Sequence, residues 1–142
     1  MAYWIKINYE RSIYLIDLDS ITAFCCQPNK RITFWLPNTN QEIVLNKQNC
    51  EYDYYLILEY IKKKIEIGYK THNEYWVHII YERHEWFINF NSITTFAWEP
   101  NGRITFWLPD STKDIIINPN NNQEAYEKVL KFVNKVTGNS LP

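Results

Sequence analysis

Glycine, cysteine and long apolar runs are scarce in this chain, and each shortage excludes a class of protein. Three glycines in 142 residues leave no glycine-rich loop for a phosphate group, and no nucleophile-elbow motif is present. No stretch of about 18 apolar residues exists, so the sequence predicts no membrane helix. The N-terminal segment MAYWIKINYERS also lacks the charged start and the apolar run of a signal peptide.

The cysteines are few and oddly numbered. Cys25, Cys26 and Cys50 do not have the C-x-x-C spacing of redox or zinc sites. Cys25 and Cys26 are adjacent on a predicted strand, so their side chains should point to opposite faces. We interpret all three as reduced, structural thiols of a cytoplasmic protein. No cluster of Cys, His and carboxylate residues has the spacing of a metal site, so neither a metal nor a cofactor is expected.

A surplus of one charge is also lacking. The chain has 15 Lys and Arg residues against 16 Asp and Glu residues, a net charge of −1. Nucleic-acid binders usually carry a basic surplus, so this balance disfavours nucleic acid as a partner without excluding a local basic patch. Apolar residues make up 46% and aromatic residues 17% of the chain, which is the composition of a folded protein.

The strongest feature that is present is an internal repeat. The segment RITFWLP at residues 31–37 returns unchanged at 103–109, and the match extends without a gap from Tyr3 and Tyr75 to Lys63 and Lys135. The offset is 72 residues. A unit of this size buries only about 60% of its extended-chain surface, which makes it marginally stable alone. We therefore expect two units, residues 1–70 and 73–142, packed as one compact body with a short linker at 69–74.

Hydrophobic periodicity predicts the same elements in each unit. Alternating apolar residues indicate a small antiparallel sheet of four or five strands, and a stripe with a period of 3.6 residues then indicates one helix. Gly68 and Gly138 are placed to end the two helices. In one turn, Lys30 stands where the second unit has Gly102. Glycine accepts the positive φ of such a turn without steric cost, so the first copy of the turn should be slightly less favourable. The predicted fold is α+β: a tandem repeat of a sheet followed by a helix, with the units related by an approximate twofold axis.

The helix of each unit should cover one face of its sheet, the face of Ile32, Phe34 and Leu36 in the first copy. The opposite face is unusual because it is also apolar. It contains Trp4, Leu15, Trp35 and either Phe24 or Cys25 in the first copy and Trp76, Ile80, Phe87 and Trp107 in the second, interleaved with Lys6, His78, Arg31 and Arg103. Three interpretations remain open for it: burial between the two units, an interface for another protein or a second copy, or a stacking platform for single-stranded nucleic acid.

The sequence therefore predicts a non-enzymatic binding or scaffolding module that acts through protein–protein contacts, including self-association as a homodimer. The alternative is a single-stranded nucleic-acid binder, in which aromatic rings stack on bases and arginines contact phosphates. A third hypothesis, an enzyme with a site between the units, finds no nucleophile or acid pair in the sequence, so no catalytic residues are predicted. The predicted binding residues are Trp4, Arg31, Trp35, Trp76, Arg103 and Trp107.

Overall fold

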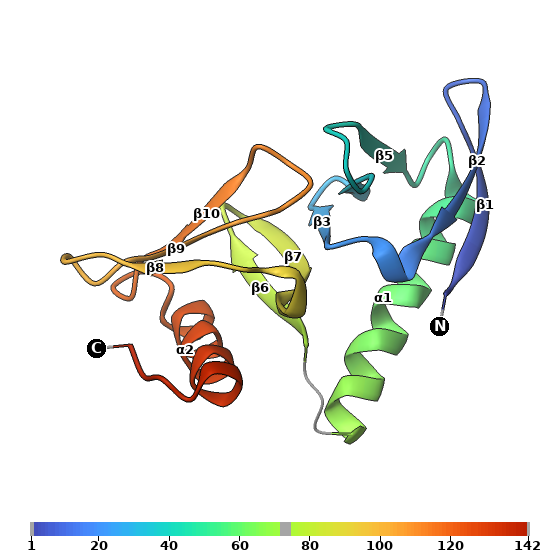
Figure 1. The fold of residues 1–142 in the computed structure, drawn as a ribbon. Helices are drawn as coiled ribbons and strands as arrows, with labels where there is room; N and C mark the ends of the chain where they lie inside the picture. Colours follow the sequence, from blue (N-terminus) through green and yellow to red (C-terminus); the bar gives the residue numbers. More distant parts are fainter. Residues whose placement is uncertain (1, 72–74, 142) are drawn as a thin grey trace.

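The chain forms an α+β fold of antiparallel strands and two α-helices, as shown by a computed structural model that describes residues 2–71 and 75–141 (Figure 1). The order of elements in the first half recurs in the second half: two strands, a short 3-10 helix, three strands and an α-helix. The first half contains β1 (Trp4–Tyr9), β2 (Ser12–Asp17), η1 (Leu18–Ser20), β3 (Ala23–Gln27), β4 (Arg31–Trp35), β5 (Glu42–Asn46) and α1 (Glu51–Thr71). The second half contains β6 (Trp76–Tyr81), β7 (His84–Asn89), η2 (Phe90–Ser92), β8 (Phe96–Trp98), β9 (Ile104–Trp107), β10 (Asp114–Ile117) and α2 (Gln123–Thr137).

Each half opens with a hairpin whose two turn residues are charged. Glu10 and Arg11 have φ angles of 48° and 69°, and Glu82 and Arg83 have φ angles of 53° and 66°. Positive φ at both central positions is the type I′ geometry, whose twist matches that of the flanking strands. Asn-Gly is the usual sequence for this turn. Its absence hides the turn type from a reading of the sequence.

Both predicted helices are present, and one of them ends later than predicted. α2 ends where Gly138 adopts a left-handed φ of 72°, as expected for a C-terminal glycine. α1 continues past Gly68 to Thr71, so the prediction that Gly68 ends it is wrong. An interior glycine costs a helix only about 1 kcal/mol relative to alanine, so it does not by itself end a helix. Of the predicted linker, residues 69–71 are helical and residues 72–74 lie outside the described residues. No helix within the described ranges is long and apolar enough to cross a membrane.

The strands of the described residues form three antiparallel sheets, and the largest sheet joins the two halves. Its order is β5-β4-β3-β7-β6, so three strands come from the first half and two from the second. β1 and β2 remain a two-stranded hairpin, and β10-β9-β8 remain a three-stranded sheet. The sequence predicts that each unit keeps its strands in one sheet of its own. Instead, the strands of each unit are divided between two sheets, and β7 of the second half pairs with β3 of the first.

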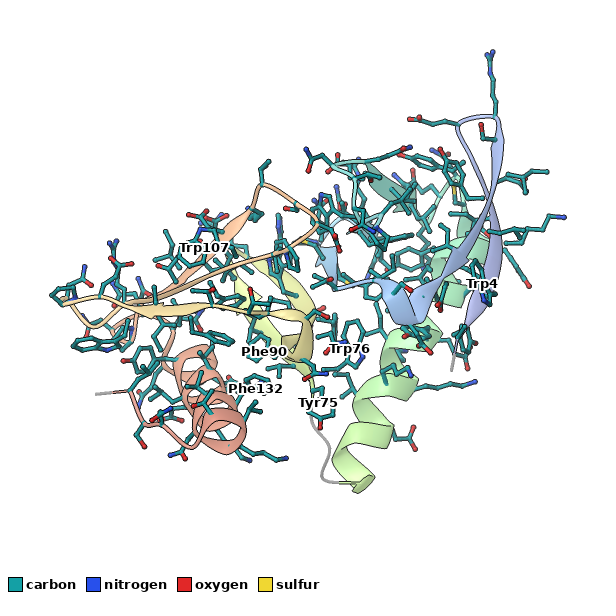
Figure 2. All side chains as sticks on the ribbon, in the orientation of Figure 1. Trp4, Tyr75, Trp76, Phe90, Trp107 and Phe132 are labelled. Carbon is teal, nitrogen blue, oxygen red and sulfur yellow. The ribbon has the colours of Figure 1, made fainter. Side chains whose placement is uncertain are left out.

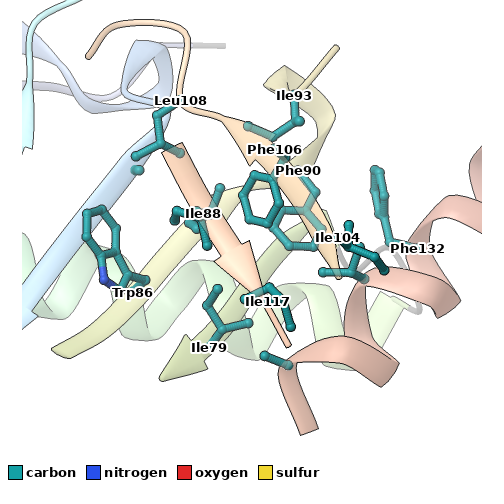
Figure 3. Close-up of a cluster of buried hydrophobic side chains, with 14 of the residues drawn as sticks. Ile79, Trp86, Ile88, Phe90, Ile93, Ile104, Phe106, Leu108, Ile117 and Phe132 are labelled. Carbon is teal, nitrogen blue, oxygen red and sulfur yellow. The ribbon is translucent and has the colours of Figure 1, made fainter. Parts of the chain in front are cut away.

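Each helix covers an apolar cluster, as the periodicity predicts. The cluster under α1 contains Tyr54, Ile57 and Ile61 together with Ile32, Phe34, Ile43 and Leu45 of the sheet. The cluster under α2, shown in Figure 3, contains Val129, Phe132 and Val133 together with Ile104, Phe106, Ile115 and Ile117.

The second hairpin lies between these two clusters. Trp86 and Ile88 on β7 belong to the cluster under α2, whereas Trp76 and Phe87 pack against the cluster under α1. Successive residues of a strand point to opposite faces, so this hairpin is covered on both faces. The double-sided apolar pattern of the sequence therefore has a structural explanation in the second half, where both faces of the hairpin are in contact with other elements.

Candidate interaction surfaces

β3 and β7 join the two halves edge to edge, and their contact is hereafter the junction. The register places Phe24 opposite Phe87 and Cys25 opposite Trp86. One further backbone hydrogen bond runs from the Asn89 N–H to the carbonyl oxygen of Thr22, at 2.8 Å. The ladder therefore makes one continuous sheet out of strands from both halves.

Aromatic side chains fill both faces of the junction. On one face, Phe24 is fully buried, with its ring centroid 5.5 Å from that of Phe34 and 5.8 Å from that of Trp76. On the other face, Trp35 stacks on Trp86, with the ring centroids 5.8 Å apart and the ring planes inclined by 1°. Aromatic pairs of this kind contribute about 0.5–1.5 kcal/mol each beyond the area that they bury.

A carboxylate of the second half fastens the junction from one side. Asp110 accepts a hydrogen bond from Thr22 Oγ1 and another from the backbone N–H of Asn38, both at 3.1 Å. Thr22 is buried, so the first bond provides an acceptor for a hydroxyl that bulk water reaches poorly. The junction is thus held by a backbone ladder, by aromatic packing and by this polar contact.

The first hairpin has an open outer edge. Within the described part of the chain, β2 pairs only with β1. Ile13 and Leu15 on β2 are 65% and 68% exposed, and Trp4, on the same face of the hairpin, is 65% exposed (Figure 2). Adjacent exposed apolar side chains beside an unpaired strand edge are typical of interaction sites. Trp4, Ile13 and Leu15, with the edge of β2, are called the hairpin end.

A second open edge lies on β8. Among the described residues, β8 pairs only with β9. The Glu99 N–H donates to the carbonyl oxygen of Arg103 at 2.9 Å, so the alternation of an antiparallel pair directs the backbone groups of Phe96 and Trp98 away from β9. Trp107, on β9, is 48% exposed. The outer edge of β8 together with Trp107 is called the β8 end.

The outer edges of β5 and β10 are covered by tyrosines of the hairpins. The Val44 N–H on β5 donates to the hydroxyl of Tyr9 at 3.3 Å, and the Ile116 N–H on β10 donates to the hydroxyl of Tyr81 at the same distance. Edge strands expose backbone groups that attract other strands, and a side chain that bonds them reduces this tendency. These two edges are therefore poor sites for a further strand.

Side chains from α2 cover the edge of β6 in a similar way. Lys128 Nζ donates to the carbonyl oxygen of His78 at 2.6 Å, and Asn122 Nδ2 donates to the carbonyl oxygen of Ile80 at 2.8 Å. β1, for its part, borders a shallow groove against α1 that Tyr52 helps to line. Among the described residues, no such side-chain bond covers the outer edge of β1, β2 or β8. Of these three strands, β2 and β8 correspond in the repeat to β7 and β3, the two strands that pair at the junction.

The six residues predicted for binding are not brought together on one surface. Trp4 and Trp107 are exposed and lie far apart, in different halves of the molecule (Figure 2). Trp35 and Trp76 lie at the junction, on opposite faces of the five-stranded sheet. Arg31 is half-buried on β4. A continuous platform of these rings, as the nucleic-acid alternative needs, is not formed by a single chain.

Arg103, the sixth predicted residue, is engaged within the chain. Its Nη2 atom lies 2.6 Å from Glu99 Oε2, and Thr105 Oγ1 donates to the other carboxylate oxygen at 2.7 Å. The bonds from Thr105 and Arg103 hold the pKa of the Glu99 carboxyl below its usual range. A guanidinium that already bonds a carboxylate is less available for a phosphate.

A polar cluster of Tyr60, Asp19 and Lys64 joins η1 to α1. The Tyr60 hydroxyl donates to Asp19 Oδ1 at 2.5 Å, and Lys64 Nζ lies 3.2 Å from the same oxygen. Burial, and then the bond to Asp19, raises the pKa of the Tyr60 phenol. A phenol that holds its proton more firmly is a poorer base and nucleophile near neutral pH. The cluster therefore fastens η1 to the helix.

The environment of Cys25, which is buried, and of Cys26, which is half-buried, raises the pKa of both thiols. Burial raises the pKa of Cys25 to about 11 and that of Cys26 to about 12. The two side chains belong to different apolar clusters, which confirms that they point to opposite faces of β3. The thiolate is the reactive form, so both react slowly near neutral pH. In the ranges that the structure describes, no group of three His, Cys or carboxylate residues converges on a metal site.

Comparison with known proteins assigns neither a family nor a function. No family model matches the chain, and neither the curated proteins nor the solved structures include a significant match. The functional conclusion therefore depends on the contacts and exposures of the residues themselves.

Sequence reasoning missed Ile13, and it did not identify β2 and β8 as open edges. A signal was present in the differences between the copies. Ile13 stands where the second half has Glu85, and Trp98 stands where the first half has Cys26. At these two positions the ends are more apolar than the junction. The open edges are determined by which hairpin, β1–β2 or β6–β7, joins the sheet of the other half. The repeat in the sequence does not specify this choice.

Proposed function

We propose that this protein is a non-enzymatic module that binds or scaffolds protein partners through its open strand edges. The hairpin end carries the proposal, because Ile13, Leu15 and Trp4 are exposed beside the unpaired edge of β2. A strand with free N–H and C=O groups accepts an added strand from another polypeptide, and the neighbouring side chains then determine specificity. In this proposal the halves are two copies of one unit. The approximate twofold axis between the halves stays a prediction. β3 pairs with β7, but the corresponding strands β8 and β2 do not pair with each other within the chain.

The junction supports this mode of binding. It is itself a strand addition, in which β7 extends the sheet of β3, and it is anchored by Phe24, Trp35 and Trp86. Aromatic anchors in packed pockets are typical of the residues that dominate protein–protein affinity. The chain therefore already joins its own halves by the chemistry that is open at both of its ends.

Reduced thiols support a cytoplasmic location, which is part of the proposal. Cys25, Cys26 and Cys50 are all free. Disulfides form and persist in oxidising compartments, so three free cysteines favour a reducing one.

Site-specific photocrosslinking tests the proposal in the cells that naturally produce the protein. A benzophenone amino acid replaces Leu15 at the hairpin end. In a matched control it replaces Ile80, which is 56% exposed on β6 but lies on an edge already bonded by Asn122. We expect polypeptide adducts from position 15 and few from position 80. No adduct at position 15, or equal adducts at both positions, contradicts the proposal.

Single-stranded nucleic acid is the second candidate, and one observation favours it. Trp4 is exposed, and Lys6 follows two residues later on the same face of the hairpin. This pair suits one base and one phosphate, whereas a single strand is usually bound by several rings along a basic groove. Tryptophan fluorescence with a mixed single-stranded oligonucleotide, at low and moderate salt, separates the candidates. We expect no change, and a salt-sensitive quench would replace the protein-binding proposal with this one.

A further inference from the structure

The parts of the fold that stay unpaired within one chain complement each other. The five-stranded sheet consists of β3, β4 and β5 of the first half plus the hairpin β6–β7 of the second half. The remaining parts are the hairpin β1–β2 and the sheet β8-β9-β10. In the repeat, the hairpin β1–β2 corresponds to β6–β7, and the sheet β8-β9-β10 corresponds to β3, β4 and β5. They lie at opposite ends of the molecule (Figure 1), so a single chain does not join them. Two copies of the chain can.

We propose that β2 of one chain pairs antiparallel with β8 of a second copy and completes another five-stranded sheet between the chains. The inference rests on the proposed function, because it takes the open edges to be protein-binding surfaces. The register at the junction transfers through the 72-residue offset. At the junction, Phe87 pairs with Phe24, so Leu15 should pair with Phe96 of the second copy. Likewise Glu85 pairs with Cys26, so Ile13 should pair with Trp98 of the second copy.

The backbone groups of the two edges are in phase for this register. On β8, Phe96 and Trp98 direct their N–H and C=O groups away from β9. On β2, the two-residue turn bonds alternate residues to β1, starting with Ser12, so those of Ile13 and Leu15 point outward. Each proposed pair therefore joins two residues whose backbone groups face the open edge.

The aromatic contacts on one face of the junction have exposed counterparts at the ends. Trp76 packs with its ring centroid 5.8 Å from Phe24 and 6.4 Å from Tyr60. The repeat offset places Trp4, now 65% exposed, against Phe96 and Phe132 of the second copy. Trp4 thus gains the same kind of aromatic site that its counterpart, Trp76, occupies.

The opposite face of the junction shows the same correspondence. Trp35 stacks on Trp86, which is only 2% exposed. The counterparts of these two residues are Trp107, at the β8 end, and Tyr14, on β2. In the proposed contact, Tyr14 lies against Trp107 of the second copy and covers a ring that is 48% exposed in the single chain.

Differences between the copies favour a second copy of this chain as the partner. Where the junction has Glu85 and Cys26, the ends have Ile13 and Trp98, and the counterpart of Lys64 is Val136. A contact between separate chains must offset the loss of translational and rotational freedom, which a contact within one chain does not. The apolar side chains at Ile13, Trp98 and Val136 supply additional burial at these positions.

The proposed contact is heterologous, because it joins two different surfaces. Each chain offers one hairpin end and one β8 end, so the assembly either closes as a ring or extends as a filament. Blocking either end of every chain therefore abolishes the assembly. A mixture of chains blocked at different ends retains one productive contact.

Sedimentation velocity and native mass spectrometry of the full chain test this complementarity. The hairpin-end variant carries Ile13→Lys and Leu15→Lys. The β8-end variant carries Trp107→Lys and Thr95→Lys, and Thr95 directly precedes β8 and corresponds to Ala23, which pairs with Ile88 at the junction. All four residues are exposed, so the fold of each monomer should persist. We expect the wild type to form dimers or larger assemblies, and each variant to self-associate at least about a hundredfold more weakly, because a lysine without a partner would be buried in the contact. The two variants mixed should form a 1:1 complex.

Ile80→Lys is the matched control, and it should assemble as the wild type does. The inference is overturned if the wild type stays monomeric across the micromolar range, if only one end variant loses assembly, or if the mixed variants do not combine. A photocrosslinked adduct of Leu15 with a different polypeptide, together with a monomeric wild type, overturns the inference and leaves the proposed function standing. No adduct and no assembly overturns both.

Discussion

The junction and the two ends of the molecule contain corresponding residues in different surroundings. Trp76 and Trp4 occupy the same position in the repeat, yet Trp76 packs on Phe24 while Trp4 is 65% exposed. Trp35 and Trp107 differ in the same way. The side chains are identical within each pair, so the difference comes from the neighbour that is present or absent. The burial of these tryptophans therefore depends on the contact between units. Variants that alter the contact test whether the exposed tryptophans belong to a binding surface.

The largest expected difference concerns Phe24 and its counterpart Phe96. Phe24 is fully buried at the junction, so Phe24→Ala should lower the free energy of unfolding by about 3–5 kcal/mol. Phe96 is half-buried at the β8 end, and Phe96→Ala should cost about half as much. Urea denaturation in the hairpin-end variant, where assembly does not contribute, measures both. Equal losses would mean that the junction adds no stability beyond that of a single unit.

A smaller difference is expected between Trp35 and Trp107. Trp35→Ala removes the stacking on Trp86 and should lower the unfolding free energy by about 2 kcal/mol. Trp107→Ala should change the stability of the monomer by less than about 0.5 kcal/mol, as for most exposed positions. In the wild-type background, the Trp107→Ala protein should assemble less tightly. A large stability loss from Trp107→Ala in the monomer would contradict the assignment of Trp107 to an open surface.

Tyr60 and its counterpart Phe132 differ by one hydroxyl group at the same position of the two helices. Tyr60→Phe removes the hydrogen bond to Asp19, so it should lower the unfolding free energy by about 1 kcal/mol at neutral pH. The folded state raises the pKa of the phenol, so its contribution is fully present below the unfolded pKa of about 10 and is lost as the pH rises above it.

Urea denaturation between about pH 9 and about pH 11 checks the sign of this effect. The wild type should lose stability more steeply than Tyr60→Phe as the pH rises. Cys25 and Cys26, whose pKa values are also raised, contribute equally to both proteins and serve as an internal control. Parallel curves would show that the Tyr60 phenol is not linked to folding.

The smallest expected effect compares the two copies of one turn. Lys30 has a φ of 63° where its counterpart, Gly102, has a φ of 89°. Glycine adopts positive φ without steric cost, so Lys30→Gly should raise the unfolding free energy by up to about 1 kcal/mol, and Gly102→Lys should lower it similarly. The thermal midpoints of the two variants should move in opposite directions. Shifts in the same direction would rule out backbone strain as the cause.

The elements were predictable because their signals are local. The alternation from Tyr3 to Tyr9 and the stripe of Tyr54, Ile57 and Ile61 depend only on which residues share a face of a strand or a helix. The buried face of Ile32 and Phe34 follows from the same rule. Boundaries that depend on a balance of small terms were not predictable, as the continuation of α1 beyond Gly68 shows.

The interaction surfaces were predictable only in part. Trp4 and Trp107 were identified as binding residues from their place in the repeat, and both are exposed. Trp35 and Trp76 were identified by the same reasoning, and the junction covers them. Sequence position does not distinguish these cases, because the residues correspond pairwise. The open edges of β2 and β8 depend on strand pairing between segments far apart in the chain.

The sequence by itself determined the order of strands and helices, the two apolar clusters and the presence of a second apolar face, since these follow from periodicity and from the repeat. Only the tertiary structure decided which hairpin joins which sheet. β3 corresponds to β8 in the repeat, and β7 corresponds to β2. The local signals therefore allow β7 to pair with β3 and equally allow β2 to pair with β8. In the structure the second hairpin pairs with β3, and the first hairpin and β8 lie at opposite ends (Figure 1).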